Sequence, residues 1–308
     1  MDRKKYLVTG GAGFIGSNLA KALEQQGHEV TVLDDFAHHG HFENLTGFGG
    51  DVITLDLSTQ MPENDYYDGI FHEAALTDTT VTDQPEMMKH NVEGFRHILD
   101  YAAENEIRKV VYASSISVYG NGPVPMRENQ PARPANIYGF SKLTDENLAR
   151  KFAQDNQDIK IIGLRYGKVF GPGECFKGNM ASIVYQLYCQ MKQGARPRLF
   201  KNGEQQQDFV YVKDIVKANL CAMKNGKETA VYNVGSAQAH SYNEVAACLN
   251  RVLNTQLEPE YIDNPHTGWQ AGSLADIGLA KEKIGYEPDY PLEKAIADYV
   301  EILEEKSK

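Results

Sequence analysis

The sequence predicts an α/β protein in which a doubly wound parallel sheet is joined to a smaller C-terminal α/β lobe. Three observations support this fold class. Apolar segments that suit buried strands alternate with helical segments along the first half of the chain, as is typical of a parallel sheet covered by helices on both faces. A glycine-rich turn joins the first strand to the first helix. After about residue 171 the alternation is less regular, so we expect one domain at 1–170 and a second lobe at 171–308, with some segments crossing back to the sheet.

The elements follow in order along the chain. Short apolar runs predict strands at 5–9, 29–33, 51–55, 69–72, 109–113 and 159–164. The first helix follows the glycine turn and ends near residue 26, because Gly27 suits a helix C-terminus. Two further helices of the first domain are expected at 85–103 and 138–154. The second lobe is expected to contain short strands and helices at 180–193, 212–224, 242–253 and 292–303.

Composition excludes several classes of function. The net charge of −11 argues against a general binder of nucleic acids or anionic membranes. No apolar stretch approaches the length of a membrane span, and the N-terminal apolar run is too short for a secretion signal. The cysteines are scattered without a C-x-x-C pair, as expected for free thiols in a reducing compartment. We therefore expect a cytoplasmic protein with neither a nucleic-acid nor a membrane partner.

The turn after the first strand contains Gly10, Gly13 and Gly16. Small residues between a strand and a helix let the backbone approach a pyrophosphate, whose charge is favoured at the helix N-terminus. Asp34 follows the second strand, about 20 residues further on, where an acidic side chain accepts hydrogen bonds from the adenosine ribose. This pattern predicts a Rossmann-type dinucleotide site. Asp34 favours NAD over NADP and Asp35 would repel a 2′-phosphate, although a protonated His41 leaves NADP possible.

Further cofactor contacts are expected near the ends of the next strands. Asp56 could bond the adenine amino group or cap its strand, and the sequence is equally compatible with both roles. The small residues Ala74 and Ala75 would let the backbone pass close to the cofactor. The remaining expected cofactor contacts are Phe14, Ile15, Leu57 and Asn91.

The segment after the second strand also contains His38, His39 and His41. These histidines fit a solvated loop better than a metal site, so no metal is expected. His72 ends the fourth strand, where a structural role is favoured over a catalytic one.

Tyr138 and Lys142 lie four residues apart in an expected helix, so both side chains project from one face. A fixed positive charge beside a tyrosine favours the phenolate form, which can take a proton from an alcohol while a hydride leaves the same carbon. The spacing alone is weak evidence, because it recurs at Tyr188 with Lys192 and at Tyr290 with Lys294. Only the first pair follows a strand that ends in a serine, Ser115, in the crevice where open α/β sheets bind ligands. We therefore expect Ser115, Tyr138 and Lys142 to be catalytic.

With these motifs the chain resembles the extended short-chain dehydrogenase/reductase family over essentially its whole length, and in particular the nucleotide-sugar-modifying branch. Leu164-Arg165-Tyr166, Gly171-Pro172 and the segment 208–214 also resemble that branch. The resemblance implies that Ser115 positions the substrate hydroxyl, that Tyr138 is the acid/base and that Lys142 holds the nicotinamide ribose. It also implies a nucleotide-diphosphate sugar as substrate, a C-terminal lobe that binds it, and a homo-oligomeric enzyme.

The same resemblance narrows the reaction. Dehydratases of this branch carry an acidic pair after the catalytic hydroxyl and related decarboxylases carry a glutamate there, whereas this chain has Ile116-Ser117. Elimination and decarboxylation therefore lack their usual acid, and the reactions that remain are epimerisation and simple reduction. The segments 77–88, 173–182 and 269–276 resemble ADP-L-glycero-D-manno-heptose 6-epimerases. In those enzymes the lysine that matches Lys177 is a second acid/base, although by spacing alone Lys177 would be a surface lysine.

The expected substrate contacts are Thr79, Ser115, Lys168, Lys177, Gln207 and Tyr211. Lys168 and Gln207 stand where many relatives carry an asparagine and an arginine that face the nucleotide or its diphosphate, and Lys168 could supply the charge that Gln207 lacks. Asp34 with Asp35 fits poorly with the NADP preference expected of the heptose enzymes, so NAD is expected and NADP stays possible. Two alternatives stay open: a UDP-hexose 4-epimerase, which does not need Lys177, and a non-catalytic dinucleotide-binding regulator.

Overall fold

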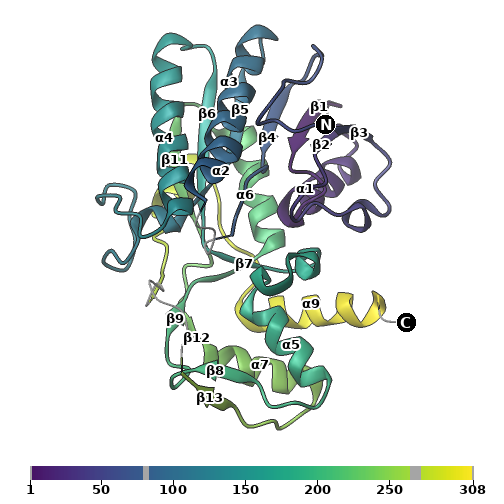
Figure 1. Cartoon of the computed structure of the whole chain (residues 1–308), viewed down its shortest axis with the longest axis vertical. Coiled ribbons are helices and arrows are strands. Elements are labelled where there is room, and N and C mark those ends of the chain that lie inside the picture. The colour runs from purple at the N-terminus through teal and green to yellow at the C-terminus, as the bar shows by residue number, and fades with distance from the viewer. Residues whose placement is uncertain (1, 79–82, 264–271, 307–308) are drawn as a thin grey trace.

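The structure is a computed structural model that describes residues 2–78, 83–263 and 272–306. Its centre is a seven-stranded sheet with the order β11-β6-β5-β4-β1-β2-β3, which occupies the upper half of Figure 1. Each pair of neighbouring strands is parallel. The strands are β1 (Lys5–Thr9), β2 (Glu29–Asp34), β3 (Asp51–Thr54), β4 (Gly69–His72), β5 (Lys109–Ser115), β6 (Lys160–Tyr166) and β11 (Ala230–Val234). The strand order reverses between β1 and β4, and ligands bind beside such a reversal in doubly wound folds.

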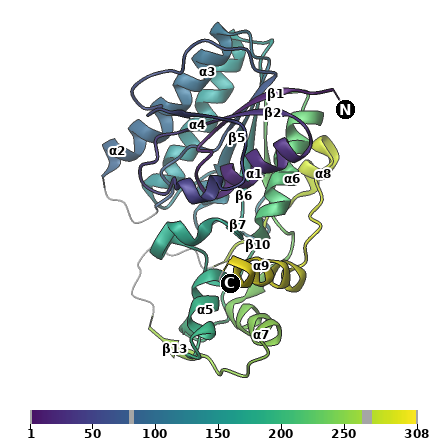
Figure 2. The ribbon, with the colours of Figure 1, turned by 90° about the vertical axis from the view of Figure 1, so that its right-hand side faces the viewer.

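Helices cover both faces of this sheet, with α3 and α4 on one side of the strands and α6 and α8 on the other in Figure 2. One face is covered by α1 (Phe14–Gln25), α6 (Val212–Asn225) and α8 (Gly278–Ile284). The opposite face is covered by α3 (Gly94–Glu104) and α4 (Ile137–Asp155). The predicted fold class, a doubly wound parallel sheet of the Rossmann type, is therefore confirmed.

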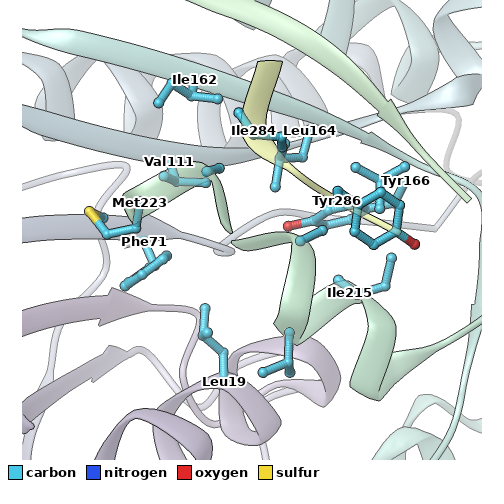
Figure 3. Close-up of a cluster of buried hydrophobic side chains, with 14 of the residues drawn as sticks. Leu19, Phe71, Val111, Ile162, Leu164, Tyr166, Ile215, Met223, Ile284 and Tyr286 are labelled. Atoms are coloured by element: carbon cyan, nitrogen blue, oxygen red, sulfur yellow. The ribbon is translucent and has the colours of Figure 1, made fainter. Parts of the chain in front are cut away.

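The core on the α1 side fixes the glycine turn to the sheet. Figure 3 shows Leu19 from α1 and Ile215 from α6 among strand residues such as Phe71 and Ile162. Leu19, Phe71, Ile162 and Ile215 are fully buried, and burying one such side chain stabilises a fold by about 1.5–3 kcal/mol. This packing holds α1, and therefore the glycine turn that precedes it, at the carboxyl ends of β1 and β4.

The C-terminal lobe has its own apolar core, in the lower half of Figure 1. It lies between α5 (Ile183–Lys192), α7 (Tyr242–Leu253) and α9 (Leu292–Lys306). Short strands complete the lobe: β7 (Lys168–Phe170) with β10 (Phe209–Tyr211), β8 (Arg198–Phe200) with β13 (Glu260–Ile262), and β9 (Gln206–Gln207) with β12 (His240–Ser241). Phe14, at the start of α1, packs into this second core, so α1 and the C-terminal lobe are in direct contact.

The structure departs from the expected elements at two places. The single helix expected at 85–103 is α2 (Gln84–Met88), a π-helical turn η2 (Lys89–Glu93) and α3 in succession. The helix α8 was not expected. The strand β11 follows the helix expected at 212–224 and pairs with β6, so the chain returns to the central sheet after residue 171. The boundary between residues 170 and 171 stays a prediction. In the described part of the chain, no helix is both long enough and apolar enough to cross a membrane.

Candidate active site

The helix α4 begins one residue before Tyr138. Asn136 caps its N-terminus, since the Asn136 Oδ1 accepts a 2.8 Å hydrogen bond from the backbone N–H of Gly139. Gly139 packs against the 3₁₀ turn η3 (Ile116–Tyr119), where a Cβ at position 139 would lie 2.6 Å from the carbonyl oxygen of Ser117. The glycine therefore allows α4 to approach the segment that follows Ser115.

A buried hydrogen-bond network fixes α4 two turns further along. The carboxylate of Glu146 accepts two hydrogen bonds from the guanidinium of Arg165 on β6, at 2.8 and 2.6 Å, and one from the hydroxyl of Ser114 on β5, at 2.7 Å. Arg165 also donates to the hydroxyl oxygen of Tyr119 at 2.5 Å. Charge-assisted, two-pronged pairs of this kind are geometrically specific, so the network sets the position of α4 on the sheet.

A single cleft of about 430 Å³ runs along the carboxyl ends of the strands and continues into the C-terminal lobe. Most of the expected site residues line it. They are Gly10, Gly13, Phe14, Ile15, Gly16, Asp34, Asp35, Asp56, Leu57, Ala74, Ala75, Ser115, Tyr138, Lys142, Lys168 and Lys177. Residues from widely separated segments of the sequence therefore meet around one ligand-sized space, as expected for this edge of an open α/β sheet.

The glycine turn leaves room for a dinucleotide. Gly10 has a φ of +64°, and a Cβ there would lie 2.6 Å from the backbone nitrogen of Ala74. A Cβ at Gly16 would lie 2.2 Å from the carbonyl oxygen of Gly10. No side chain caps the N-terminus of α1, so its first N–H groups can face a pyrophosphate. The residues present therefore fit the dinucleotide that the sequence predicts.

Asp34 lies at the end of the cleft where the adenosine of the dinucleotide is expected, and it is tied to the glycine turn. Its carboxylate accepts hydrogen bonds from the backbone N–H groups of Ala12 and Phe36, both at 2.9 Å. Burial raises the pKa of Asp34, against the effect of these two hydrogen bonds. The same strand end is where an NAD-binding fold presents an acceptor to the ribose.

Comparison with known proteins decides the family. Residues 6–235 match the model of the NAD dependent epimerase/dehydratase family. The chain belongs to this family. It is 34% identical to an ADP-L-glycero-D-manno-heptose-6-epimerase of Brachyspira hyodysenteriae, over 97% of each chain. The expected NAD-dependent epimerase of the extended short-chain dehydrogenase/reductase family is thereby confirmed.

Solved structures of epimerases have the same fold as this chain. The ADP-L-glycero-D-manno-heptose-6-epimerase of Helicobacter pylori superimposes with a TM-score of 0.90 and 39% identity, covering 98% of this chain and 96% of the other. A UDP-glucose 4-epimerase of Thermotoga maritima, solved with UDP-glucose, superimposes with a TM-score of 0.90 and 29% identity, covering 99% of this chain and 100% of the other.

In this epimerase Lys177 lies on the 3₁₀ segment η4 (Glu174–Met180), which packs over the start of α1. Its Nζ lies 5.8 Å from the centre of the Phe14 ring. Burial lowers the pKa of Lys177, while the nearby carboxylate of Glu174 opposes that shift. Glu174 is itself buried and accepts hydrogen bonds from the backbone N–H of Gly171 and the hydroxyl of Ser182, both at 2.9 Å. Lys177 is therefore a partly desolvated amine on a fixed segment rather than a surface lysine.

Lys168 begins β7 and is exposed to the cleft. Desolvation by the surrounding protein lowers the pKa of its ammonium. Among the described residues, no carboxylate forms an ion pair with Lys168 or Lys177. The acidic lining residues Asp34, Asp35, Asp56 and Glu73 come instead from the ends of β2, β3 and β4. The wall of the cleft formed by residues 168–177 is therefore the cationic one.

Three expected contacts lie elsewhere. Gln207 is fully buried, and its side-chain oxygen accepts a hydrogen bond from Ser273 at 2.8 Å. The hydroxyl of Tyr211 donates to Asp298 at 2.5 Å inside the C-terminal lobe. Asn91 is fully buried, and its side-chain amide donates a 2.9 Å hydrogen bond to the hydroxyl of Ser141. Ser141 lies one turn along α4 from Tyr138. None of the three lines the cleft, so their positions indicate structural roles, and Thr79 lies outside the described residues.

The two other tyrosine–lysine pairs also lie away from the cleft. Tyr188 donates a 2.8 Å hydrogen bond to Glu304, and Lys192 pairs with the same carboxylate. The ammonium of Lys294 lies 4.3 Å from the ring centre of Tyr290. His72 is buried and its Nδ1 lies 2.8 Å from the hydroxyl of Thr9, in keeping with a structural role.

Sequence reasoning missed two acidic groups near Lys142. Glu73 lines the cleft and accepts a 2.9 Å hydrogen bond from the hydroxyl of Tyr166. Burial raises the pKa of Glu73 to about 7, against hydrogen bonds from Tyr166 and Asn219. Asp145 lies 3.4 Å from the ammonium of Lys142. The signal for Asp145 was present in the sequence, because it follows Lys142 by three residues and so shares its helix face.

The histidine-rich segment lies at the adenosine end. His38, Glu86 and His90 bring ligand atoms within 4.8 Å of one another, and so do Asp35, Asp56 and His90. Asp35, Asp56, His38 and His90 line the cofactor cleft, so we assign this cluster to that site.

Proposed function

We propose that this protein is an NAD-dependent epimerase of nucleotide-diphosphate sugars, most similar in its chemistry to the ADP-L-glycero-D-manno-heptose 6-epimerases. The observation that carries the proposal is that two proton-carrying side chains, Tyr138 on α4 and Lys177 on η4, line one cleft together with Ser115 and Lys142. Inverting a carbon through a ketone needs hydride removal from one face and return to the other. Two separate proton-transfer groups suit that requirement.

NAD, when bound, supplies a nicotinamide ring that accepts a hydride and returns it. The residues that would hold it are the glycine turn, Asp34 and Lys142. The phenolate of Tyr138 takes the proton of the sugar hydroxyl while the hydrogen on the same carbon leaves as a hydride, which gives a ketone. Ser115 donates a hydrogen bond to the reacting oxygen. After the ketone has turned, the ammonium of Lys177 gives a proton to that oxygen as the carbon regains its hydride on the opposite face.

The cationic wall of the cleft supports an anionic substrate. Lys168 and Lys177 have no ion-pair partner in the described part of the chain, and both face the cleft. A diphosphate would satisfy these two charges, and lysine is a common phosphate ligand. Lys168 therefore offers the charge that the buried Gln207 does not.

We also propose that the protein acts in the cytoplasm as a homo-oligomer. The scattered free cysteines support a reducing compartment. On α4, the side chain of Phe140 is 49% exposed, which suits a contact between subunits. Light scattering of the purified chain tests the second part, and a monomer at micromolar concentration would contradict it.

The substrate is tested by incubating the full chain and NAD with ADP-D-glycero-D-manno-heptose and following inversion at C6 by NMR. We expect inversion, with strong loss in Tyr138→Phe and in Lys177→Met. If NAD binds but C6 is not inverted, the substrate assignment is wrong.

The similarity to the UDP-glucose 4-epimerase of Thermotoga maritima favours one alternative, a UDP-hexose 4-epimerase. UDP-glucose is therefore assayed in parallel. Turnover of UDP-glucose that survives Lys177→Met would favour this alternative, because a single tyrosine suffices for 4-epimerisation. Loss of C6 inversion in Lys177→Met, with NAD binding retained, supports the first proposal.

A further inference from the structure

Lys142 and Asp145 form a buried pair on the catalytic helix. The Nζ of Lys142 lies 3.4 Å from the Oδ2 of Asp145, and both side chains are 2% exposed. The Oδ1 of Asp145 is buried without a hydrogen-bond partner among the described residues. A buried carboxylate oxygen with no donor lowers the stability of a fold. Such a group calls for an explanation other than stability.

The groups around the pair come from several elements. On α4 itself, Glu146 follows Asp145 but is already neutralised by Arg165 from β6. Burial raises the pKa of Tyr112 on β5 well above 10, and the negative charge of Asp145 raises it further. Burial lowers the pKa of His72 on β4 to about 3, and the positive charge of Lys142 acts in the same direction.

Glu73 follows β4, and the positive charge of Lys142 lowers its pKa against the effect of burial. Around neutral pH, therefore, Tyr112 and His72 stay uncharged. Asp145 and Glu73 are the two acidic groups near Lys142 whose pKa is raised to about 7.

We propose that Asp145 is a positioning residue that holds the ammonium of Lys142 in place and offsets its charge beside the cofactor cleft. This inference rests on the proposed function, in which Lys142 holds the nicotinamide ribose and supports Tyr138. A lysine side chain has several rotatable bonds, and a fixed carboxylate one turn away limits where its ammonium can lie. No other described acidic side chain forms an ion pair with Lys142.

The charge effect depends on pH. Burial raises the pKa of Asp145 to about 7, while the charge of Lys142 opposes this shift. Below that pH the pair carries one positive charge, and above it the pair is neutral. Oxidised NAD carries a positive nicotinamide and reduced NAD does not, so a neutral pair favours the oxidised form. The affinity ratio of oxidised to reduced cofactor should therefore rise as the pH passes through about 7.

The test measures dissociation constants of NAD and NADH on the full chain by calorimetry, from about pH 5.5 to about pH 9. In the parent protein we expect the affinity ratio to rise at least about threefold across neutrality. Asp145→Asn should abolish this rise. Asp145→Glu, which restores a carboxylate, should retain it, and so should Asp155→Asn, a matched change at the exposed end of α4.

The variant Glu73→Gln distinguishes the contribution of Glu73 to the pH dependence from that of Asp145. The rise should survive in Glu73→Gln if Asp145 is responsible. A rise that persists in Asp145→Asn, or that disappears in Glu73→Gln or Asp155→Asn, would overturn the proposal. This binding experiment does not depend on the sugar substrate, so it can succeed even if the proposed reaction is wrong.

The positioning role has its own readout in turnover. Asp145→Ala should lower kcat by about tenfold or more with little change in the KM of the sugar substrate, because Lys142 acts on the reacting groups and the cofactor and not on the nucleotide part of that substrate. Asp145→Asn, which keeps an oxygen for the ammonium, should recover most of this loss below about pH 6, where the parent Asp145 is protonated. Equal losses in both variants at every pH would contradict the positioning role. If Asp145→Ala does not fold, the comparison of Asp145→Asn with Asp145→Glu decides the question.

Discussion

Glu146 and Arg165 face each other across the junction of α4 and β6, joined by two hydrogen bonds of 2.8 and 2.6 Å. Both side chains are buried. The pair links the helix that carries Tyr138 to the sheet whose carboxyl ends form the cleft. We therefore expect loss of this pair to lower the stability of the fold more directly than it lowers the rate of the reaction.

Removing one member of this pair should destabilise the protein. Glu146→Gln leaves the Arg165 guanidinium buried without its counter-ion, which typically costs about 3–5 kcal/mol in the free energy of unfolding. Urea unfolding followed by circular dichroism measures the change. The control is Glu293→Gln, which breaks the exposed pair with Arg251 and should leave the midpoint nearly unchanged. Similar midpoints for both variants would contradict the assigned role.

Gly139 is expected to be needed for catalysis. In Gly139→Ala the new Cβ would meet the carbonyl oxygen of Ser117 at 2.6 Å, so α4 must move away from the segment that holds Ser115. We expect kcat to fall by about tenfold to a hundredfold, because small displacements of catalytic groups are costly. Gly94→Ala in α3 is the matched control, since its nearest contact would be an ordinary 3.7 Å. Steady-state kinetics on both variants checks the prediction.

Tyr138→Phe should remove the proton acceptor and lower kcat by about 10²–10⁴-fold, with NAD binding retained. Tyr188→Phe removes a hydroxyl from the second tyrosine–lysine pair, where it only donates to Glu304. Its effect should be confined to a modest loss of stability. Single-turnover measurement of sugar epimerisation distinguishes the two variants, and comparable activity in both would refute the assignment of Tyr138.

Lys168→Met should weaken substrate binding more than it slows the reaction. Because Lys168 has no ion-pair partner in the described residues, its charge is available to a diphosphate. We expect the KM for the nucleotide sugar to rise by about tenfold, which corresponds to about 1.4 kcal/mol of binding, with kcat changed much less. The rise should shrink at high salt, since screening weakens the same interaction in the parent protein. A large fall in kcat at unchanged KM would place Lys168 outside the diphosphate site.

Stability should fall as the pH rises towards 7, in part because of Glu73. The pKa of Glu73 is raised from 4.5 to about 7 in the folded protein, so the folded state binds a proton that the unfolded state has lost. Its stabilising contribution is therefore full below about pH 4.5 and is lost as the pH rises through about 7. The loss amounts to at most about 3 kcal/mol. Thermal unfolding between these pH values should show a smaller fall in Glu73→Gln than in the parent protein.

The parts of the site that depend on short-range patterns could be predicted from the sequence. The glycine turn, Asp34 and the Tyr138–Lys142 pair are set by local spacing, and they line the cleft as expected. Asn91, Gln207 and Tyr211 could not be placed in this way. Their side chains form hydrogen bonds with residues distant in sequence, namely Ser141, Ser273 and Asp298.

The fold shows the same division. Strands β1 and β4 have the expected bounds, because each is a short apolar run. The helix expected at 85–103 contains a π-helical turn around Asn91, and no local pattern marks that turn. It accompanies the hydrogen bonds of Asn91 to Leu76 and Ser141. The pairing of β11 with β6 depends likewise on a contact between residues far apart in the chain.

The return of the chain to the central sheet limits how this enzyme can be divided. A fragment that ends at residue 170 would lack β11, and β6 would become an edge strand with unpaired backbone groups, a template for aggregation. The same fragment would lack α6 and α8, so the apolar face beneath them would be exposed to water. Exchanging substrate preference with a relative therefore requires two separate grafts, one on each side of the segment from α6 to β11, rather than a swap of the C-terminal half.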